Sequence, residues 1–247
     1  MKAAPRVVRS SAARPEPATI ASLDRLGAVV WPAALDLPRV RAWSGAVRRA
    51  RSDWTADFGG EQYSLGRAFY THYETGRAEL YFREAAASDA LVDRHLPGMQ
   101  AWVTALFARM TESVVRPRLG FCGPGVHVFP AGGQVARHGG VVHYDVEGLS
   151  PVCLSRRLPA LSLVLMLEPV AWGGGLWLWG ARFRGSEAAT DAEIAAPHTA
   201  VRYGAGDALL MSSYRLHQIR PFRGRRDRIS ITLHAQQVDD GVFEVWF

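Results

Sequence analysis

From Gly120 onward the chain is a succession of short β-type runs separated by glycine and proline, with no helical periodicity between them. Runs of β-branched, aromatic and aliphatic residues that are bounded by such breakers are typical of strands. We expect eight strands, over residues 126–129, 141–145, 161–168, 176–179, 199–203, 207–212, 216–222 and 228–235. Eight short strands in this length predict a jelly-roll, in which two sheets close face to face.

The chain before Gly120 differs in composition and pattern. Residues 1–19 are rich in alanine, arginine, proline and serine and lack the apolar stretch of a secretory signal, so we expect a disordered tail there. The 247-residue length suits one domain with a modest extension. We therefore expect a single domain over residues 20–247, helical over 20–119 and mainly β over 120–247.

The helical part contains three readable segments. A short helix followed by a strand is expected over residues 20–31. Apolar residues at helical spacing predict an amphipathic helix over residues 37–50. The clearest helix is predicted over Ser88–Glu112, with Ser88 as its N-cap and a kink or interruption at Pro97. These helices are expected to cover one sheet of the β core.

Composition excludes several classes of protein. The net charge of +6 comes from scattered arginines without a nucleic-acid-binding motif, so we do not expect a nucleic-acid partner, although a basic rim that attracts an anionic substrate stays open. The longest apolar run, over residues 161–167, is too short to span a membrane. Cys122 and Cys153 form no C-x-x-C pair and suit a reducing, cytoplasmic compartment. The oligomeric state is not predicted.

His143 and Asp145 are the first candidates for metal ligands. They lie two residues apart on an expected strand, so their side chains project from the same face. Gly139-Gly140 just upstream allows the strand to enter tightly. A histidine from a later strand must complete the site, and His217 is our choice because it opens a strand after an apolar run.

Other histidines compete for this role. His198 precedes a strand, and His138 is the main rival beside the first pair. Its five-residue offset from His143 places it on the opposite face of an extended strand, unless the intervening glycines turn the chain. His234 and His127 are expected to be structural, each hydrogen-bonded within the sheets.

The last expected strand alternates in polarity. Arg228, Ser230, Thr232 and His234 fall on one face, and Ile229, Ile231 and Leu233 fall on the other. If helices pack on the apolar face, the polar face lines the interior of the barrel. Buried polar groups are costly unless they have partners, and a bound anion and a metal would supply them.

The order and spacing of these features resemble the Fe(II)/2-oxoglutarate-dependent oxygenases. The resemblance covers roughly residues 126–235 and rests on four segments: His143-Tyr144-Asp145, the Gly-rich run 173–179, the turn and strand 203–210, and the stretch from His217 to Ile231. It implies a mainly β fold with flanking helices, whose core is a double-stranded β-helix of the jelly-roll or cupin type.

The resemblance also implies a chemistry. His143, Asp145 and His217 would bind Fe(II), and Arg228 with Ser230 would bind the far carboxylate of 2-oxoglutarate, with Arg226 as the alternative anchor. O2 would be consumed as 2-oxoglutarate is decarboxylated to succinate, and hydroxylation of a small-molecule substrate is the default outcome. Desaturation, epoxidation and ring closure stay open. Relatives that halogenate lack the carboxylate, so Asp145 argues against halogenation.

Two alternative functions remain. One is a protein-residue hydroxylase with the layout of prolyl hydroxylases, and the other is a non-catalytic β-sandwich that serves as a sensor or binding module. Tyr144 is expected to point away from the metal. Residues that could lie near the cavity mouth are Arg137, Glu147, Trp177, Trp179 and Arg182. Residues 150–159 and 185–197 could form lids.

Overall fold

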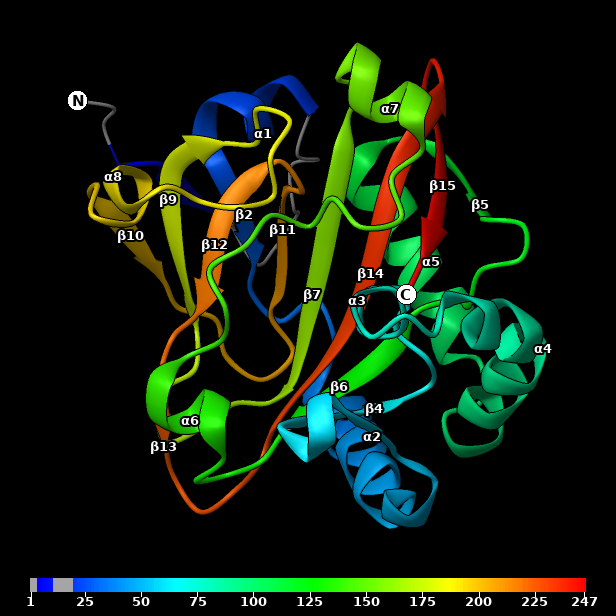
Figure 1. The fold of residues 1–247 in the computed structure, drawn as a ribbon. Helices are drawn as coiled ribbons and strands as arrows, with labels where there is room; N and C mark the ends of the chain where they lie inside the picture. The colour runs from blue at the N-terminus through cyan, green and yellow to red at the C-terminus, as the bar shows by residue number, and fades with distance from the viewer. Residues whose placement is uncertain (1–3, 11–19) are drawn as a thin grey trace.

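Strands from both halves of the chain build one large sheet, which we call the major sheet (Figure 1). The computed structural model describes residues 4–10 and 20–247. The main path of the sheet runs β1 (Arg6–Arg9), β2 (Gly27–Trp31), β11 (Ala208–Ser212), β7 (Ala160–Glu168), β14 (Arg228–Asp239), β6 (Gly125–Phe129), β4 (Gln62–Leu65) and β3 (Thr55–Asp57). β15 (Val242–Trp246) also pairs with β14, and β5 (Val114–Pro117) pairs with β15.

A smaller sheet faces the major sheet. This minor sheet has the order β10 (His198–Val201), β9 (Leu176–Arg182) and β12 (Arg215–Ile219), and β8 (Trp172–Gly173) pairs with β13 (Phe222–Arg223) beside it. Leu176 and Leu178 of β9 pack against Met166 and Leu209 of the major sheet. Side chains alternate along a strand, so Trp177 and Trp179 lie on the outer face of the minor sheet.

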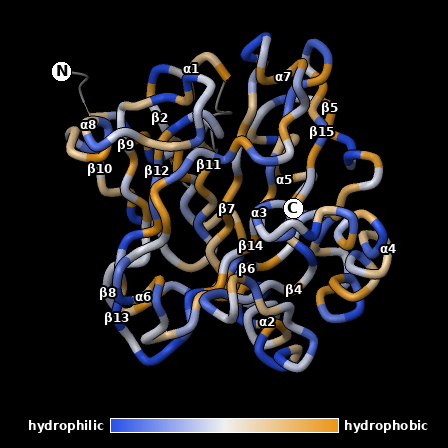
Figure 2. The backbone as a smooth tube through the Cα atoms, in the orientation of Figure 1, coloured by the Kyte–Doolittle hydropathy of each residue, from blue (hydrophilic) through white to orange (hydrophobic). Residues whose placement is uncertain are grey.

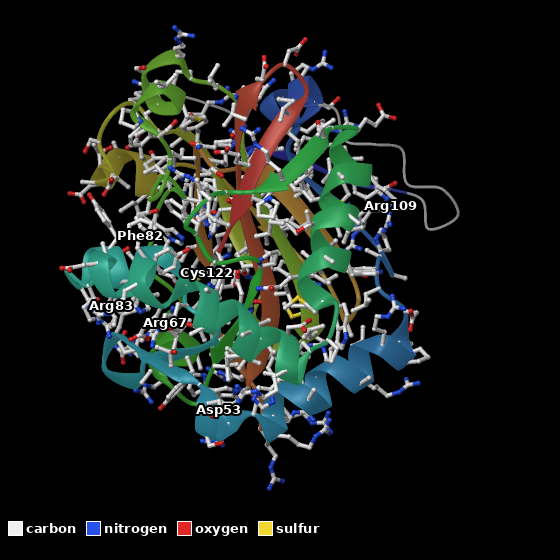
Figure 3. The ribbon with its side chains drawn as sticks, turned by 90° about the vertical axis from the view of Figure 1, so that its right-hand side faces the viewer. Asp53, Arg67, Phe82, Arg83, Arg109 and Cys122 are labelled. Carbon is white, nitrogen blue, oxygen red and sulfur yellow. The ribbon has the colours of Figure 1, made fainter. Side chains whose placement is uncertain are left out.

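Helices cover the other face of the major sheet. They are α1 (Ile20–Leu26), α2 (Leu37–Arg49), α5 (Met99–Thr111) and the C-terminal part of α4 (Ala78–His95). α3 (Phe69–Glu74) and the start of α4 pack instead in a separate cluster with Tyr144 and Trp246. Short 3-10 turns lie at Arg51–Asp53 and Phe58–Gly60. Figure 3 views the layers from their edge and shows the green helix α5 to the right of the red C-terminal strands, with the teal helix α4 toward the viewer. No helix within the described residues is long and apolar enough to cross a membrane.

The alternation of polar and apolar side chains along β14 determines which face of the major sheet is covered by the helices. Ile229, Ile231 and Leu233 are at most 1% exposed and pack in the same cluster as Val103 and Phe107 of α5. Burying such a side chain contributes about 1.5–3 kcal/mol, which outweighs the weak intrinsic preferences of the strand. Figure 2 shows the apolar residues gathered along β7, β11 and β14. The polar face of β14 therefore turns toward the minor sheet, as the sequence predicts.

Most of the expected strands are confirmed, with two differences. Residues 141–145 do not form a strand, because only a single bridge, between His143 and His217, joins them to β12. The segment lies between Gly139 and Gly148, which both have positive φ and turn the chain before the pairing can extend. The expected strand 216–222 is divided into β12 and β13.

The N-terminal region differs more from expectation. Residues 6–9, which the sequence places in a disordered tail, form β1 and pair with β2, while residues 1–3 and 11–19 lie outside the described residues. Residues 20–119 are not only helical, since they also supply the four strands β2 to β5. The sequence also misses three short helices in the β half, α6 (Gln134–His138), α7 (Pro151–Arg156) and α8 (Asp191–Ile194).

The predicted helix over Ser88–Glu112 consists of two helices. α4 begins ten residues before Ser88, which therefore lies inside the helix, and the Ser88 hydroxyl accepts a hydrogen bond from the backbone of Arg67. The N-cap assignment is wrong. The interruption at Pro97 is confirmed, because α4 ends at His95 and α5 begins after Gly98, which has a φ of 73°.

Candidate metal and anion site

The segment that carries His143 and Asp145 runs along the edge of β12. The backbone N–H groups of His143 and His217 each donate to the carbonyl oxygen of the other residue, both at 3.0 Å. Two residues further on, the backbone N–H of Asp145 donates to the carbonyl of Ser213 at 3.0 Å. This pairing brings the imidazole of His143 and the carboxylate of Asp145 to the same side as His217.

Two glycines allow the segment that carries His143 to approach β12 closely. Gly139 has a φ of 85°, and a Cβ atom placed on it would lie 2.7 Å from the carbonyl oxygen of Ile219. Gly140 follows, and its N–H donates to that same carbonyl at 3.0 Å. The expected tight entry at these glycines is confirmed.

Three side chains converge on one point. The Nε2 atoms of His143 and His217 lie 3.3 Å and 3.5 Å from Oδ1 of Asp145. One ligand atom from each residue lies within 4.8 Å of the others, and this is the one such group found within the described residues. Two imidazole nitrogens and one carboxylate oxygen are the donor set that holds one face of a non-heme Fe(II).

Backbone carbonyls orient both imidazoles. Nδ1 of His143 lies 2.8 Å from the carbonyl of Val141, and Nδ1 of His217 lies 2.9 Å from the carbonyl of Arg215. A carbonyl oxygen can only accept, so each Nδ1 carries a proton, and each Nε2 faces Asp145, where it can present a lone pair to a metal once it is deprotonated. Metal-binding histidines are usually fixed in this way. The residues present therefore fit a divalent iron ion.

The charges of the three groups are coupled. Burial lowers the pKa of His143, but the hydrogen bond and charge of Asp145 outweigh it and raise that pKa to about 9. Burial lowers the pKa of His217 to about 4, against the attraction of Asp145. Burial raises the pKa of Asp145, yet the charge of His217 and the hydrogen bond from His143 hold it well below its usual range. At neutral pH and without a metal, His143 is thus a cation that carries a proton on Nε2 as well, His217 is neutral, and Asp145 is ionised.

The site is open on the His143 side. The side chain of His143 is 39% exposed, whereas that of His217 is 5% exposed. The groups nearby are acidic: burial and the charge of the ligand carboxylate raise the pKa of Glu147 to about 7. Burial and the charge of Glu187 also raise the pKa of Glu74, which interacts with His143. Acidic side chains therefore lie near the open side of the site.

Arg228 is buried on the interior face of β14, with 2% of its surface exposed. Its Nε donates to the carbonyl of Gly174 at 2.8 Å, Nη1 to the hydroxyl of Ser230 at 3.0 Å, and Nη2 to the hydroxyl of Tyr203 at 2.8 Å. No carboxylate of the described residues pairs with it. A guanidinium has five N–H donors, so two are left over. A buried cation without a counter-ion is costly, which makes this position a candidate anion site.

The Gly-rich run 173–175 shapes the same region. A Cβ on Gly175 would lie 2.1 Å from the carbonyl oxygen of Val201, and Gly174 has a φ of 69°. Such contacts leave room for glycine only. The close approach sets the carbonyl of Gly174 within reach of Arg228.

Arg226 is not brought into the barrel. It lies in the bend before β14, its side chain is 78% exposed, and its guanidinium pairs with Glu168 at 3.2 Å. Glu168 in turn accepts a hydrogen bond from Ser44 and pairs with Arg48, both on α2. Arg226, which the sequence left open as the alternative anchor, therefore lies on the helical side of the major sheet and does not share the interior face of Arg228.

The rival histidines lie elsewhere. His138 is exposed in α6 and lies outside the group of three. His198 packs against Trp177 and Trp179 on the outer face of the minor sheet, with ring centroids 5.1 Å and 5.0 Å apart. These two tryptophans therefore face away from the metal ligands. Arg137 and Arg182 are exposed at the surface.

His234 and His127 were both expected to be hydrogen-bonded inside the sheets. His234 is, since its Nδ1 lies 3.3 Å from the hydroxyl of Ser162, but it also lies 4.0 Å from Oδ2 of Asp145, a proximity that the sequence does not reveal. His127 is 5% exposed, and its Nδ1 has no hydrogen-bond partner. The expectation for His127 is wrong.

Tyr144 points away from the ligand atoms, as expected. Its ring packs against Phe183, with centroids 5.6 Å apart, and it borders a cavity of about 670 Å³ behind the minor sheet. The segment 184–197, part of which we expected to act as a lid, covers this cavity. The lining residues are Tyr144, Gly180, Ala181, Arg184, Ser186, Ala188, Thr190, Ala192, Glu193, Ala195, Ala196 and Pro197.

Comparison with known proteins supports the fold. No protein-family model and no curated protein matches the sequence. Among solved structures, an N-substituted L-amino acid dioxygenase from Burkholderia ambifaria is 18% identical with a TM-score of 0.60, covering 92% of this chain and 90% of that one. The α-ketoglutarate-dependent carbocyclase SnoK from nogalamycin biosynthesis is 16% identical with a TM-score of 0.59, covering 97% and 99%.

A third similar structure contains the expected ligands. The epimerase SnoN, in complex with Fe3+, α-ketoglutarate (2-oxoglutarate) and nogalamycin RO, is 16% identical with a TM-score of 0.56, covering 87% of this chain and 82% of that one. At such identities the likeness concerns the fold. The resemblance drawn from the sequence is confirmed at that level: the chain has the double-stranded β-helix fold of the non-heme iron, 2-oxoglutarate-dependent enzymes.

Proposed function

We propose that this chain is an Fe(II)/2-oxoglutarate-dependent dioxygenase that oxidises a small molecule, with hydroxylation as the default outcome. One observation carries the proposal. A His-Asp-His group with its ligand atoms converging, and a buried arginine without a counter-ion, are held on the interior faces of the same β-helix. The first suits a divalent metal, and the second suits a carboxylate that is brought in with it.

Each of the three residues would supply one ligand atom to the metal. His143 and His217 supply Nε2, and Asp145 supplies a carboxylate oxygen and one negative charge. Iron bound there would supply what no side chain can, the activation of O2 coupled to decarboxylation of 2-oxoglutarate to succinate and CO2. The carboxylate ligand is present, so no position is left open for a halide.

Arg228 and Ser230 would bind the far carboxylate of 2-oxoglutarate. The two N–H groups that Arg228 has left over are on Nη1 and Nη2, which form the fork that matches a carboxylate. Tyr203 and Gly174 hold this fork in place from the other side. Since Arg226 pairs with Glu168 outside the barrel, Arg228 is the anchor that we propose.

The class of substrate follows from the open side of the site. Glu74, Glu147 and Glu187 lie around it, so a neutral or basic molecule is favoured there over an anionic one. The similar structures include an amino acid dioxygenase and an epimerase bound to nogalamycin RO, which also supports a small molecule. No contact within the described residues favours a peptide substrate or a non-catalytic sensor or binding module.

Succinate release tests the proposal. Purified protein with Fe(II), 2-oxoglutarate and O2 is offered N-substituted amino acids, other amines and nogalamycin RO, and succinate is quantified. We expect turnover with at least one class and none in a His217→Ala variant. If no candidate releases succinate, and the protein binds neither Fe(II) nor 2-oxoglutarate, the proposal fails.

A further inference from the structure

His127 lies beside the proposed anion site. In the pairing of β6 with β14, His127 is directly opposite Ser230, and Phe129 is directly opposite Arg228. Residues that face each other across an antiparallel pair project on the same side of the sheet. The guanidinium of Arg228 lies over the ring of Phe129, 5.3 Å from its centroid, which confirms the shared side. His127 therefore points into the same interior of the β-helix as Arg228.

The imidazole of His127 is buried but unpaired. It packs between the rings of Phe247 and Tyr70, with centroids 4.7 Å and 5.6 Å away. Nδ1 is fully enclosed and has no hydrogen-bond partner, and no hydrogen bond to Nε2 is formed within the described residues. Buried polar groups in native proteins nearly always have partners, so an unpaired imidazole at this position requires an explanation.

The protonation state follows from the surroundings. Burial, followed by the nearby positive charges of His234 and Arg228, lowers the pKa of His127 to about 3, so the ring is neutral near pH 7. A neutral imidazole carries one proton, and an enclosed, unpaired N–H is disfavoured more strongly than an enclosed acceptor. The proton therefore lies on Nε2, the nitrogen that is not fully enclosed. His127 thus offers one N–H donor without an acceptor.

We propose that Nε2 of His127 donates a hydrogen bond to bound 2-oxoglutarate, which makes His127 a third binding residue beside Arg228 and Ser230. The inference rests on the proposed function. The charges that act on His127 are those of His234, Arg228 and the metal ligand Asp145, and the last two mark the ends between which the co-substrate must extend. A dicarboxylate placed there supplies the acceptor that the protein itself lacks.

Calorimetric titration of 2-oxoglutarate into Co(II)-loaded protein tests the inference without turnover. We expect His127→Phe to raise the Kd about tenfold or more, as for loss of one hydrogen bond to a charged acceptor. His127→Gln keeps an N–H donor at the end of the side chain and should restore part of the affinity. The matched control is His198→Phe, on the outer face of the minor sheet, which should bind like the wild type.

A second readout separates binding from a structural role. Because His127 forms no hydrogen bond in the ligand-free protein, His127→Phe should not lower the melting temperature or the affinity for Co(II). His127→Leu repeats the measurement if the larger ring does not fit. An unchanged Kd, or a lowered melting temperature with an unchanged Kd, overturns the inference. If the wild type binds Co(II) but not 2-oxoglutarate, the proposed function fails as well.

Discussion

Replacing Arg228 by methionine should abolish tight binding of 2-oxoglutarate. Three of the five N–H groups of Arg228 are used by Gly174, Ser230 and Tyr203, which leaves two for the ligand. A hydrogen bond to a charged partner contributes about 1.5 kcal/mol or more, so losing two costs about 3 kcal/mol. At about 1.4 kcal/mol per tenfold change, the Kd should rise about a hundredfold. Methionine is apolar and of similar length, so it can fill the buried position.

The assay is a titration of 2-oxoglutarate into protein loaded with Co(II), with two comparison variants. Arg228→Lys keeps the charge but loses the fork, so we expect an intermediate Kd. Arg226→Ala removes an exposed side chain whose partner Glu168 keeps its contacts with α2, so we expect a Kd within about twofold of the wild type. If Arg228→Met binds normally while Arg226→Ala does not, the assignment of the anion site is refuted.

Three further predictions follow from the same geometry. His217→Ala should weaken Co(II) binding by more than tenfold in a metal-competition assay, and an unchanged affinity would remove His217 from the ligand set. Metal binding near pH 7 should release about one proton, because His143 has a raised pKa and must lose its Nε2 proton to bind. Calorimetry in buffers of different ionisation enthalpy measures the number of protons released. No release would contradict the charge assignment. Gly175→Ala should lower the free energy of unfolding by about 1–3 kcal/mol in urea denaturation, because its Cβ would collide with the carbonyl of Val201. The control Gly45→Ala, in the interior of α2, should be neutral or stabilising by up to about 1 kcal/mol. Equal effects of the two substitutions would argue against the collision.

The interior face of the last strand could be predicted from the sequence because strand alternation is a local property. Ile229 and Ile231 must be buried together, and this alone turns Arg228 and Ser230 into the barrel. The metal group was predictable for a related reason, since His143 and Asp145 are close in sequence and His217 opens a strand after an apolar run, a choice that agrees with the family resemblance.

Properties that depend on distant segments were not predictable. Residues 141–145 read as a strand, but their backbone pairing depends on where β12 ends and on the turns at Gly139 and Gly148. Arg226 is two residues from Arg228, and only the position of Glu168 draws it to the helical side. His127 reads as an ordinary buried histidine, because the absence of a partner is visible only once the strands around it are in place.

Anaerobic titration of 2-oxoglutarate into the Fe(II)-loaded protein tests the central claim most directly. Chelation of Fe(II) by a 2-oxo acid produces a visible charge-transfer absorption, which reports metal and co-substrate in one site. We expect a band that saturates at about one equivalent, is lost in His217→Ala, and requires a much higher 2-oxoglutarate concentration in Arg228→Met. A protein that binds Fe(II) but develops no band with 2-oxoglutarate would contradict the account.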